Sequence, residues 1–204
     1  MKCIDSCGHD KISSRILKIS APYVLSLLTY IFNKVLSTGI FPERLKFSEV
    51  RPLCKKGDIT EFSNYRSISL LTSFSKIIEK NIYKRLYSYL NDDNNILVGD
   101  QYGFREKFST ETAIYTLLNN VLSSLVRRTL VGGLFCDLQK AFDCINHEIH
   151  VVKMKFHGIS GIANKLEGSY LENRYQRISV NNSKPNKLYS KWVHVKHGIP
   201  QGSV

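Results

Sequence analysis

Helix-like and strand-like segments follow one another along this chain without a strict alternation. Apolar periodicity and capping residues predict helices over 22–37, 73–90, 109–126, 146–157 and 162–171. Runs of β-forming residues predict strands over 47–54, 129–137, 177–181 and 191–196. A repeated βαβ pattern would predict a parallel sheet, so the mixed order predicts an α+β fold instead.

Several boundaries of these segments have a local chemical cause. Pro22 suits the first turn of a helix, and Gly39 suits its end. Ser73 is predicted to cap the second helix through its hydroxyl. The last two strands are predicted to form a hairpin across the polar stretch "NNSKPN" at 181–186.

Positive charge is in excess and is unevenly distributed. The 204 residues include 29 Lys and Arg against 17 Asp and Glu, a net charge of +12. From Asn173 to Val204 there are six basic residues and no acidic one: Arg174, Arg177, Lys184, Lys187, Lys191 and Lys196. Such a stretch favours a polyanionic partner, most simply nucleic acid. Charge alone leaves open a basic protein with no such partner.

The cysteines and the apolar stretches bear on the compartment. Five cysteines, an odd number, and no secretion signal favour reduced thiols in a nuclear or cytoplasmic protein that is not secreted. Cys3, Cys7 and His9 lack a second ligand pair at zinc spacing, so a zinc site is not favoured. The apolar stretch 23–36 is interrupted by polar residues and is too short to span a bilayer, so no membrane partner is expected.

The segment "FCDLQKAFD" places two acids six residues apart after a predicted strand. A carboxylate at the end of a strand can bind a hard divalent cation, which prefers oxygen ligands and bridges to phosphates. Asp137 is the candidate ligand. Asp143 is predicted to cap the helix that follows.

Two other tracts carry groups that suit a phosphate-bearing ligand. Lys55 and Lys56 in "LCKKGD" and Arg66 in "NYRSISLL" could hold a triphosphate. The glycines of "GIPQGS" allow backbone to approach a ligand while Gln201 offers an amide. Taken singly, these are ordinary surface charges and an ordinary turn.

Taken together and in order, the motifs resemble the reverse transcriptase of non-LTR (LINE-type, jockey-like) retrotransposons. The matching strings are "GIFPERLK", "VRPLCKKGD", "NYRSISLLTSFSKIIEK", "QYGFREKFST", "FCDLQKAFDCINH", "SYLENRYQRISVN" and "GIPQGSV". The resemblance implies a right-hand polymerase that copies RNA into DNA with two magnesium ions. It implies an N-terminal helical segment over 1–40, fingers over 41–110 and a partial palm over 111–204, without a thumb.

The resemblance also implies roles for individual residues. Asp137 matches the first metal-binding and catalytic aspartate of the palm. Phe142 matches the aromatic gate that lies under the incoming sugar and favours deoxynucleotides. The remaining matches are to nucleotide-binding positions (Lys55, Arg66, Gln201, Gly202) and to template-binding positions in the fingers (Gln101, Phe104, Arg105). The implied partners are an RNA template, a DNA primer and deoxynucleoside triphosphates, and the oligomeric state is not indicated.

The family's second acidic motif, Tyr-X-Asp-Asp beyond "PQGS", does not occur in these 204 residues, where Asp92-Asp93 is the only adjacent acidic pair of that kind. Ser67 and His150 also depart from the family pattern. The resemblance therefore predicts a fragment that is inactive alone. A non-catalytic nucleic-acid-binding remnant and a pseudogene product remain as alternatives.

Overall fold

The structure is a computed structural model that describes residues 7–93, 96–181 and 187–202. These residues form two compact units, one of 1–84 with 140–204 and one of 85–139. The α+β fold class predicted from the sequence is confirmed, because helices and a mixed sheet are both present. The division into an N-terminal helical segment (1–40), fingers (41–110) and a partial palm (111–204) stays a prediction.

The first unit is organised around a five-stranded sheet. Its strands are β1 (Phe47–Cys54), β2 (Tyr65–Leu70), β3 (Arg174–Asn181), β4 (Lys187–Tyr189) and β5 (Val193–Val195). The order is β2-β1-β3-β4, and β5 also pairs with β3. β1 and β2 form an antiparallel hairpin, whereas β1 and β3 are parallel. Segments from the two ends of the chain therefore share one sheet.

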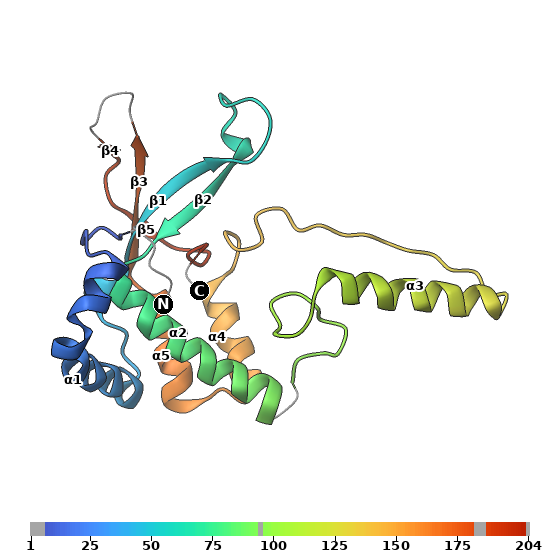
Figure 1. Ribbon diagram of the computed structural model, residues 1–204, viewed down its shortest axis with the longest axis horizontal. Helices are drawn as coiled ribbons and strands as arrows, with labels where there is room; N and C mark the ends of the chain where they lie inside the picture. Colours follow the sequence, from blue (N-terminus) through green and yellow to red (C-terminus); the bar gives the residue numbers. More distant parts are fainter. Residues whose placement is uncertain (1–6, 94–95, 182–186, 203–204) are drawn as a thin grey trace. The chain divides into compact units, whose positions relative to one another are not determined.

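The helices of this unit are α1 (Ser14–Thr38), α2 (Ser73–Tyr87), α4 (His147–Phe156) and α5 (Gly161–Leu171). A short 3₁₀ turn at Glu43–Leu45 (η1) lies between α1 and β1, and another at Phe62–Asn64 (η2) lies between β1 and β2. In Figure 1 the helices gather toward one end of the strands. Val35, Phe41, Ile78 and Leu166 form the buried core, where α1, α2 and α5 meet. This core fixes one end of the sheet.

The first helix begins earlier than its proline predicted. α1 begins at Ser14 because the Ser13 side chain caps it, and Pro22 lies inside the helix. Its end at Gly39 is confirmed, with the glycine in the left-handed conformation at φ 65°. At 25 residues, α1 is long and apolar enough to cross a membrane. The prediction that the apolar stretch 23–36 is too short to span a bilayer is therefore wrong. Only 6% of its apolar window is buried, and a single helix of this kind is weak evidence for a membrane span.

Two other predicted caps are wrong. The Thr72 hydroxyl, rather than that of Ser73, accepts a hydrogen bond from the Ser75 amide at the start of α2. The Ser73 hydroxyl instead donates to the Ile12 carbonyl. Asn146, rather than Asp143, caps α4 by accepting from the Ile149 amide at 3.1 Å. Asp143 lies three residues too early for that role, in the turn that precedes the helix.

The predicted hairpin after α5 has a more elaborate form. β3 begins at Arg174, three residues earlier than predicted, and its outer edge is shared by two short strands. β4 pairs with the end of β3 and β5 pairs with its beginning. Residues 182–186 of the predicted connection lie outside the described part of the chain.

The second unit contains α3 (Thr110–Val126) and a π-helical turn, η3 (Ser88–Asp93), that follows α2. α3 begins as predicted: Ser109 and Thr112 form a reciprocal capping box. The strand predicted over 129–137 is wrong, because these residues are extended but belong to no sheet. A strand needs a neighbour for its backbone hydrogen bonds, and no described segment pairs with this one.

Candidate functional site

Two sequence motifs that lie far apart in the chain are joined through their backbones. The Ile199 amide donates to the Phe142 carbonyl at 2.9 Å, and the Gly198 amide donates to the Ile145 carbonyl at 2.8 Å. His147 extends this contact, because its Nε2 donates to the Gly198 carbonyl at 2.7 Å. The turn before α4 and the "GIPQG" segment therefore form one structural unit.

Gly198 is required at this junction by both space and conformation. Its φ is 82°, a region that side chains rarely adopt. An added Cβ would also lie 2.8 Å from the Asp143 carbonyl oxygen and 2.9 Å from the Phe142 carbonyl oxygen. The glycine thus permits the close approach that fixes Phe142, whose side chain is 37% exposed.

The same segment continues onto the outer edge of the sheet. The Ser69 amide of β2 donates to the Gln201 carbonyl at 2.8 Å. Gly202 has a φ of 96° and packs near Ile68 of the same strand. Gln201 and Gly202 are consequently held against β2, one of the two strands of the β1–β2 hairpin.

A cavity of about 310 Å³ lies where these pieces meet. It is lined by residues of the first unit: Ser48, Ser67, Ser69, Asp143, Arg174, Gln176, Val195, His197, Gly198, Ile199, Pro200 and Gln201. Hydroxyl, amide and imidazole groups predominate among these side chains, so the cavity can form several hydrogen bonds with a polar ligand. Only Gln201 among its members was predicted as a site residue.

The sequence held a signal for two of the missed residues. Arg174 and Gln176 are two positions apart on β3 and therefore share one face of the sheet. Because the predicted strand began at Arg177, these two positions fell outside it. Ser48 pairs with Gln176 across the parallel ladder, so it shares that face as well.

Arg174 is almost fully buried and is held by its surroundings. Its guanidinium donates to the Tyr170 carbonyl at 3.0 Å and lies 4.5 Å from the centre of the Tyr170 ring. Glu79 of α2 is buried nearby and accepts a hydrogen bond from Ser75 at 2.7 Å. Burial raises the pKa of the Glu79 carboxyl, and the Ser75 hydrogen bond and the charge of Arg174 oppose that rise.

Arg66 lies on β2 and Lys55 directly follows β1, and both residues are exposed. The Lys55 amide donates to the Asn64 carbonyl at 2.9 Å, which closes the connection between the arms. In that connection, hydrogen bonds from the backbone and hydroxyl of Thr60 lower the pKa of Asp58. The hairpin thus presents one cation at the start of its connection and one on β2.

Asp137 lies in the second unit, in the extended segment after α3, and its side chain is exposed. Within the described residues, no three His, Cys, Asp or Glu side chains come together in a group that could hold a metal ion. Asp137 supplies one hard ligand, which by itself does not make a magnesium site. Cys3, one of the possible zinc ligands, lies outside the described residues.

The three predicted template residues lie in the loop before α3, also in the second unit. Gln101 and Phe104 are exposed, and Phe104 has a φ of 60°. The Arg105 guanidinium is used within the loop: it donates to the Val98 carbonyl at 3.0 Å and to Asn91 Oδ1 at 2.8 Å. Arg105 therefore orders the loop that carries the other two.

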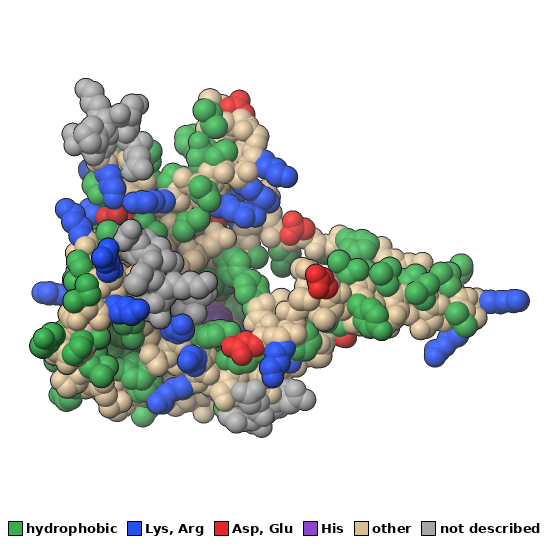
Figure 2. All heavy atoms as spheres, viewed as in Figure 1, with side chains coloured by type: hydrophobic (Ala, Val, Ile, Leu, Met, Phe, Trp, Pro, Cys, Tyr) green, Lys and Arg blue, Asp and Glu red, His purple; other side chains and the backbone are tan. Residues whose placement is uncertain are grey.

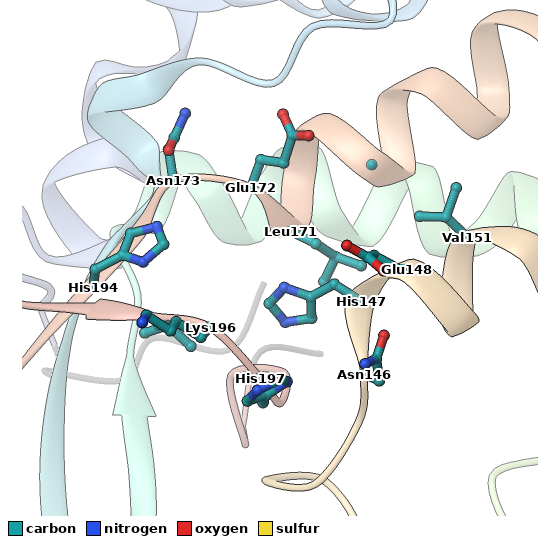
Figure 3. A pocket seen from close by; sticks show the side chains of 12 residues that line it. Asn146, His147, Glu148, Val151, Leu171, Glu172, Asn173, His194, Lys196 and His197 are labelled. Atoms are coloured by element: carbon teal, nitrogen blue, oxygen red, sulfur yellow. The ribbon is translucent and has the colours of Figure 1, made fainter.

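A second and larger cavity, of about 840 Å³, lies between α4, α5 and the segment around β5. Figure 3 shows the rings of His147, His194 and His197 among the side chains that line it, with Lys196 and the carboxylates of Glu148 and Glu172. His197 also lines the smaller cavity, so the two are neighbours. The sequence analysis did not predict this cavity.

Comparison with known proteins agrees with the motifs that meet at the smaller cavity. The profile of the family described as "Reverse transcriptase (RNA-dependent DNA polymerase)" matches residues 54–204. The chain belongs to the reverse transcriptase family. The resemblance drawn from its motifs is confirmed.

Relatives of this reverse transcriptase segment include two proteins of Drosophila melanogaster mobile elements. It is 32% identical over 200 residues to the "Probable RNA-directed DNA polymerase from transposon BS", covering 98% of this chain and 21% of that protein. It is 31% identical over 200 residues to the "RNA-directed DNA polymerase from mobile element jockey", covering 97% and 21%. The chain thus spans about a fifth of the length of these curated relatives.

Proposed function

We propose that this chain contributes the fingers and part of the palm of an RNA-directed DNA polymerase encoded by a non-LTR retrotransposon. The observation that supports this most is the junction of Phe142 and Gly198 beside the 310 Å³ cavity. It brings two separate motifs of the family together beside the sheet whose β2 carries Arg66 and whose β1 is followed directly by Lys55.

In this proposal the smaller cavity receives the sugar and base of the incoming deoxynucleotide. Gln201 and Gly202 contact the nucleotide from the edge of β2. Phe142 excludes a ribose 2′-hydroxyl by steric conflict, while the cations of Lys55 and Arg66 bind the triphosphate. Hydroxyl groups at positions 48, 67 and 69 add donors and acceptors along the cavity wall.

The template and the metal engage residues of the second unit. Gln101 and Phe104 contact the RNA template, and Arg105 holds their loop in shape. Asp137 is one ligand of a catalytic magnesium ion, whose charge would neutralise the transferring phosphate. A DNA primer completes the set of partners, and the nucleus or cytoplasm is the proposed location.

A chimera tests the proposal. This chain replaces the 200 matching residues of the jockey relative, and extension of a DNA primer on an RNA template is measured with magnesium. The chimera is expected to extend the primer. Asp137→Ala is expected to abolish extension, because transition-state charge stabilisation contributes several kcal/mol.

The control variant is Asp100→Ala, which removes an exposed acid from the same unit. It should extend at the rate of the unmodified chimera. A folded chimera that makes no product, or one that is indifferent to Asp137→Ala, contradicts the proposed function.

A further inference from the structure

One face of the sheet carries rings and a guanidinium in continuous contact. We call this the aromatic face and define it as Phe47, Tyr175, Arg177, Tyr189, Trp192 and His194. Phe47 and Tyr175 stack at 5.3 Å with an angle of 14° between their planes. Trp192 meets Phe47 edge-on at 5.1 Å, and His194 lies 5.3 Å from Tyr175. The face spans β1, β3, β4 and β5.

Arg177 orders the outer part of this face. Its guanidinium lies 4.2 Å from the centre of the Tyr189 ring and 4.6 Å from that of Trp192. It also forms an ion pair with Glu49, whose carboxylate is buried. The ion pair fixes the guanidinium, and cation–π contacts then hold two rings from different segments. The two rings are therefore positioned before any ligand arrives.

Both residues keep part of their surface open to solvent, while the His9 ring also meets Trp192 edge-on at 5.9 Å. Tyr189 is 44% exposed and Trp192, the single tryptophan of the chain, is 36% exposed. An ordered aromatic ring with an open surface can accept another flat group by stacking.

The charge around these rings has one sign. Lys187 and Lys191 flank them and are exposed, and no acidic residue occurs from Asn173 to Val204. Figure 2 shows Lys and Arg side chains over this part of the sheet, with few acidic ones among them. The surface is thus complementary to a polyanion that carries flat groups.

We propose that the aromatic face binds a single strand of nucleic acid, with bases stacked on Tyr189 and Trp192 and phosphates near Lys187 and Lys191. The faces of bases in a duplex are already stacked on one another, whereas those of a single strand are open. The site therefore prefers single-stranded to double-stranded ligands. Taking that strand to be the RNA template rests on the proposed function.

The test uses the 204-residue chain and a 12-nucleotide RNA of mixed sequence, alone or as a duplex. Binding is followed by anisotropy of the labelled RNA and by the emission of Trp192. The single strand is expected to quench Trp192 and to bind at least about tenfold more tightly than the duplex. Each of Trp192→Ala and Tyr189→Ala should weaken single-strand binding about 5- to 150-fold, the range that one stacked base contributes.

Two matched controls separate stacking from charge and from loss of folding. Tyr23→Ala removes an exposed ring from α1, far along the chain from this face, and should leave affinity unchanged. Lys191→Gln should reduce the salt dependence of binding by about 0.7 in log–log slope, whereas Tyr189→Ala should not change that slope. Trp192 emission in the unmodified chain gives a result even if one variant fails to fold.

Each outcome decides the inference. Absence of quenching together with equal affinity for duplex and single strand overturns it. Concentration-dependent dimers lost in Trp192→Ala, with RNA affinity unchanged, would assign the face to a second copy of the chain instead. An inactive chimera with intact quenching would contradict the proposed function alone, and an active chimera without quenching would contradict this inference alone.

Discussion

Single residues at the junction of the two motifs carry distinct consequences. Phe142 is 37% exposed and its carbonyl accepts a hydrogen bond from the Ile199 amide, so its backbone has a defined position. Gly198 makes that position possible through its left-handed backbone. The proposed role of Phe142 concerns substrate choice, whereas Gly198 concerns the stability of the junction.

Phe142→Val in the chimera should increase ribonucleotide use. Removing the ring makes room for a 2′-hydroxyl. Steric exclusion of a group of that size typically gives about tenfold or greater discrimination between two substrates. Single-nucleotide extension with matched ribo- and deoxyribonucleotides measures the ratio. Phe156→Val, which removes an exposed ring from the end of α4, is the control. An unchanged ratio for Phe142→Val would assign this ring to packing.

Gly198→Ala should lower the free energy of unfolding of the chain by about 1–3 kcal/mol. The Cβ would meet two backbone carbonyl oxygens, and the φ of 82° is unfavourable for alanine. Urea unfolding followed by circular dichroism measures the change. Gly132→Ala is the matched control, since a Cβ there has nothing within 4 Å. Equal stabilities for the two variants would contradict the close approach.

At the scale of elements, the sequence predicted well wherever a local signal set the boundary. β1, α3, α4 and α5 lie within a residue or two of their predicted ranges because strand-forming runs and capping residues define them. The failure over 129–137 has the opposite cause: its residues favour a strand, but strand formation depends on a partner elsewhere. The parallel pairing of β1 with β3 was not predicted for the same reason.

The candidate site was predictable to a similar degree. Motif resemblance identified Phe142, Gln201 and Gly202, which the structure places around one junction. The buried Arg174 and the serines of the cavity wall carry no motif, and tertiary pairing alone brings them there. The Asp143 cap was misassigned because Asn146, three residues later, competes for the same role.

The buried carboxyl on α2 gives this element a dependence on pH. The pKa of Glu79 is about 4.5 in the unfolded state and is raised in the folded state. The folded state therefore binds the proton of this carboxyl more tightly than the unfolded state does. The Glu79 contribution to stability is therefore largest below pH 4.5 and declines as the pH rises through the raised pKa. Urea unfolding across this range should show the decline in the unmodified chain.

Glu79→Gln should remove that part of the decline, because the amide does not titrate. Glu61→Gln, which changes an exposed acid in the same unit, should keep it. Superimposable pH profiles for the unmodified chain and Glu79→Gln would show that folding does not raise the pKa of the Glu79 carboxyl.

For the whole molecule, the net charge of +12 predicts salt-dependent binding to nucleic acid. Basic residues that contact phosphates release condensed counterions, so RNA affinity should fall steeply as salt increases. Filter binding by the 204-residue chain between about 50 and 200 mM salt should show a fall of tenfold or more, for several phosphates contacted. Affinity that is independent of salt would contradict a role for this charge.

The parallel pairing of β1 with β3 also has a consequence during synthesis. Glu49 and Arg177, which form an ion pair across these strands, are 128 residues apart. At about 5–20 residues per second, β1 has left the ribosome roughly 6–26 s before its partner strand is made. Through that interval the edge of β1 that later pairs with β3 is open, which is a template for pairing with other chains. Crowded ribosomes on one message would therefore favour aggregation at this edge, and a chaperone that covers it would favour the native sheet.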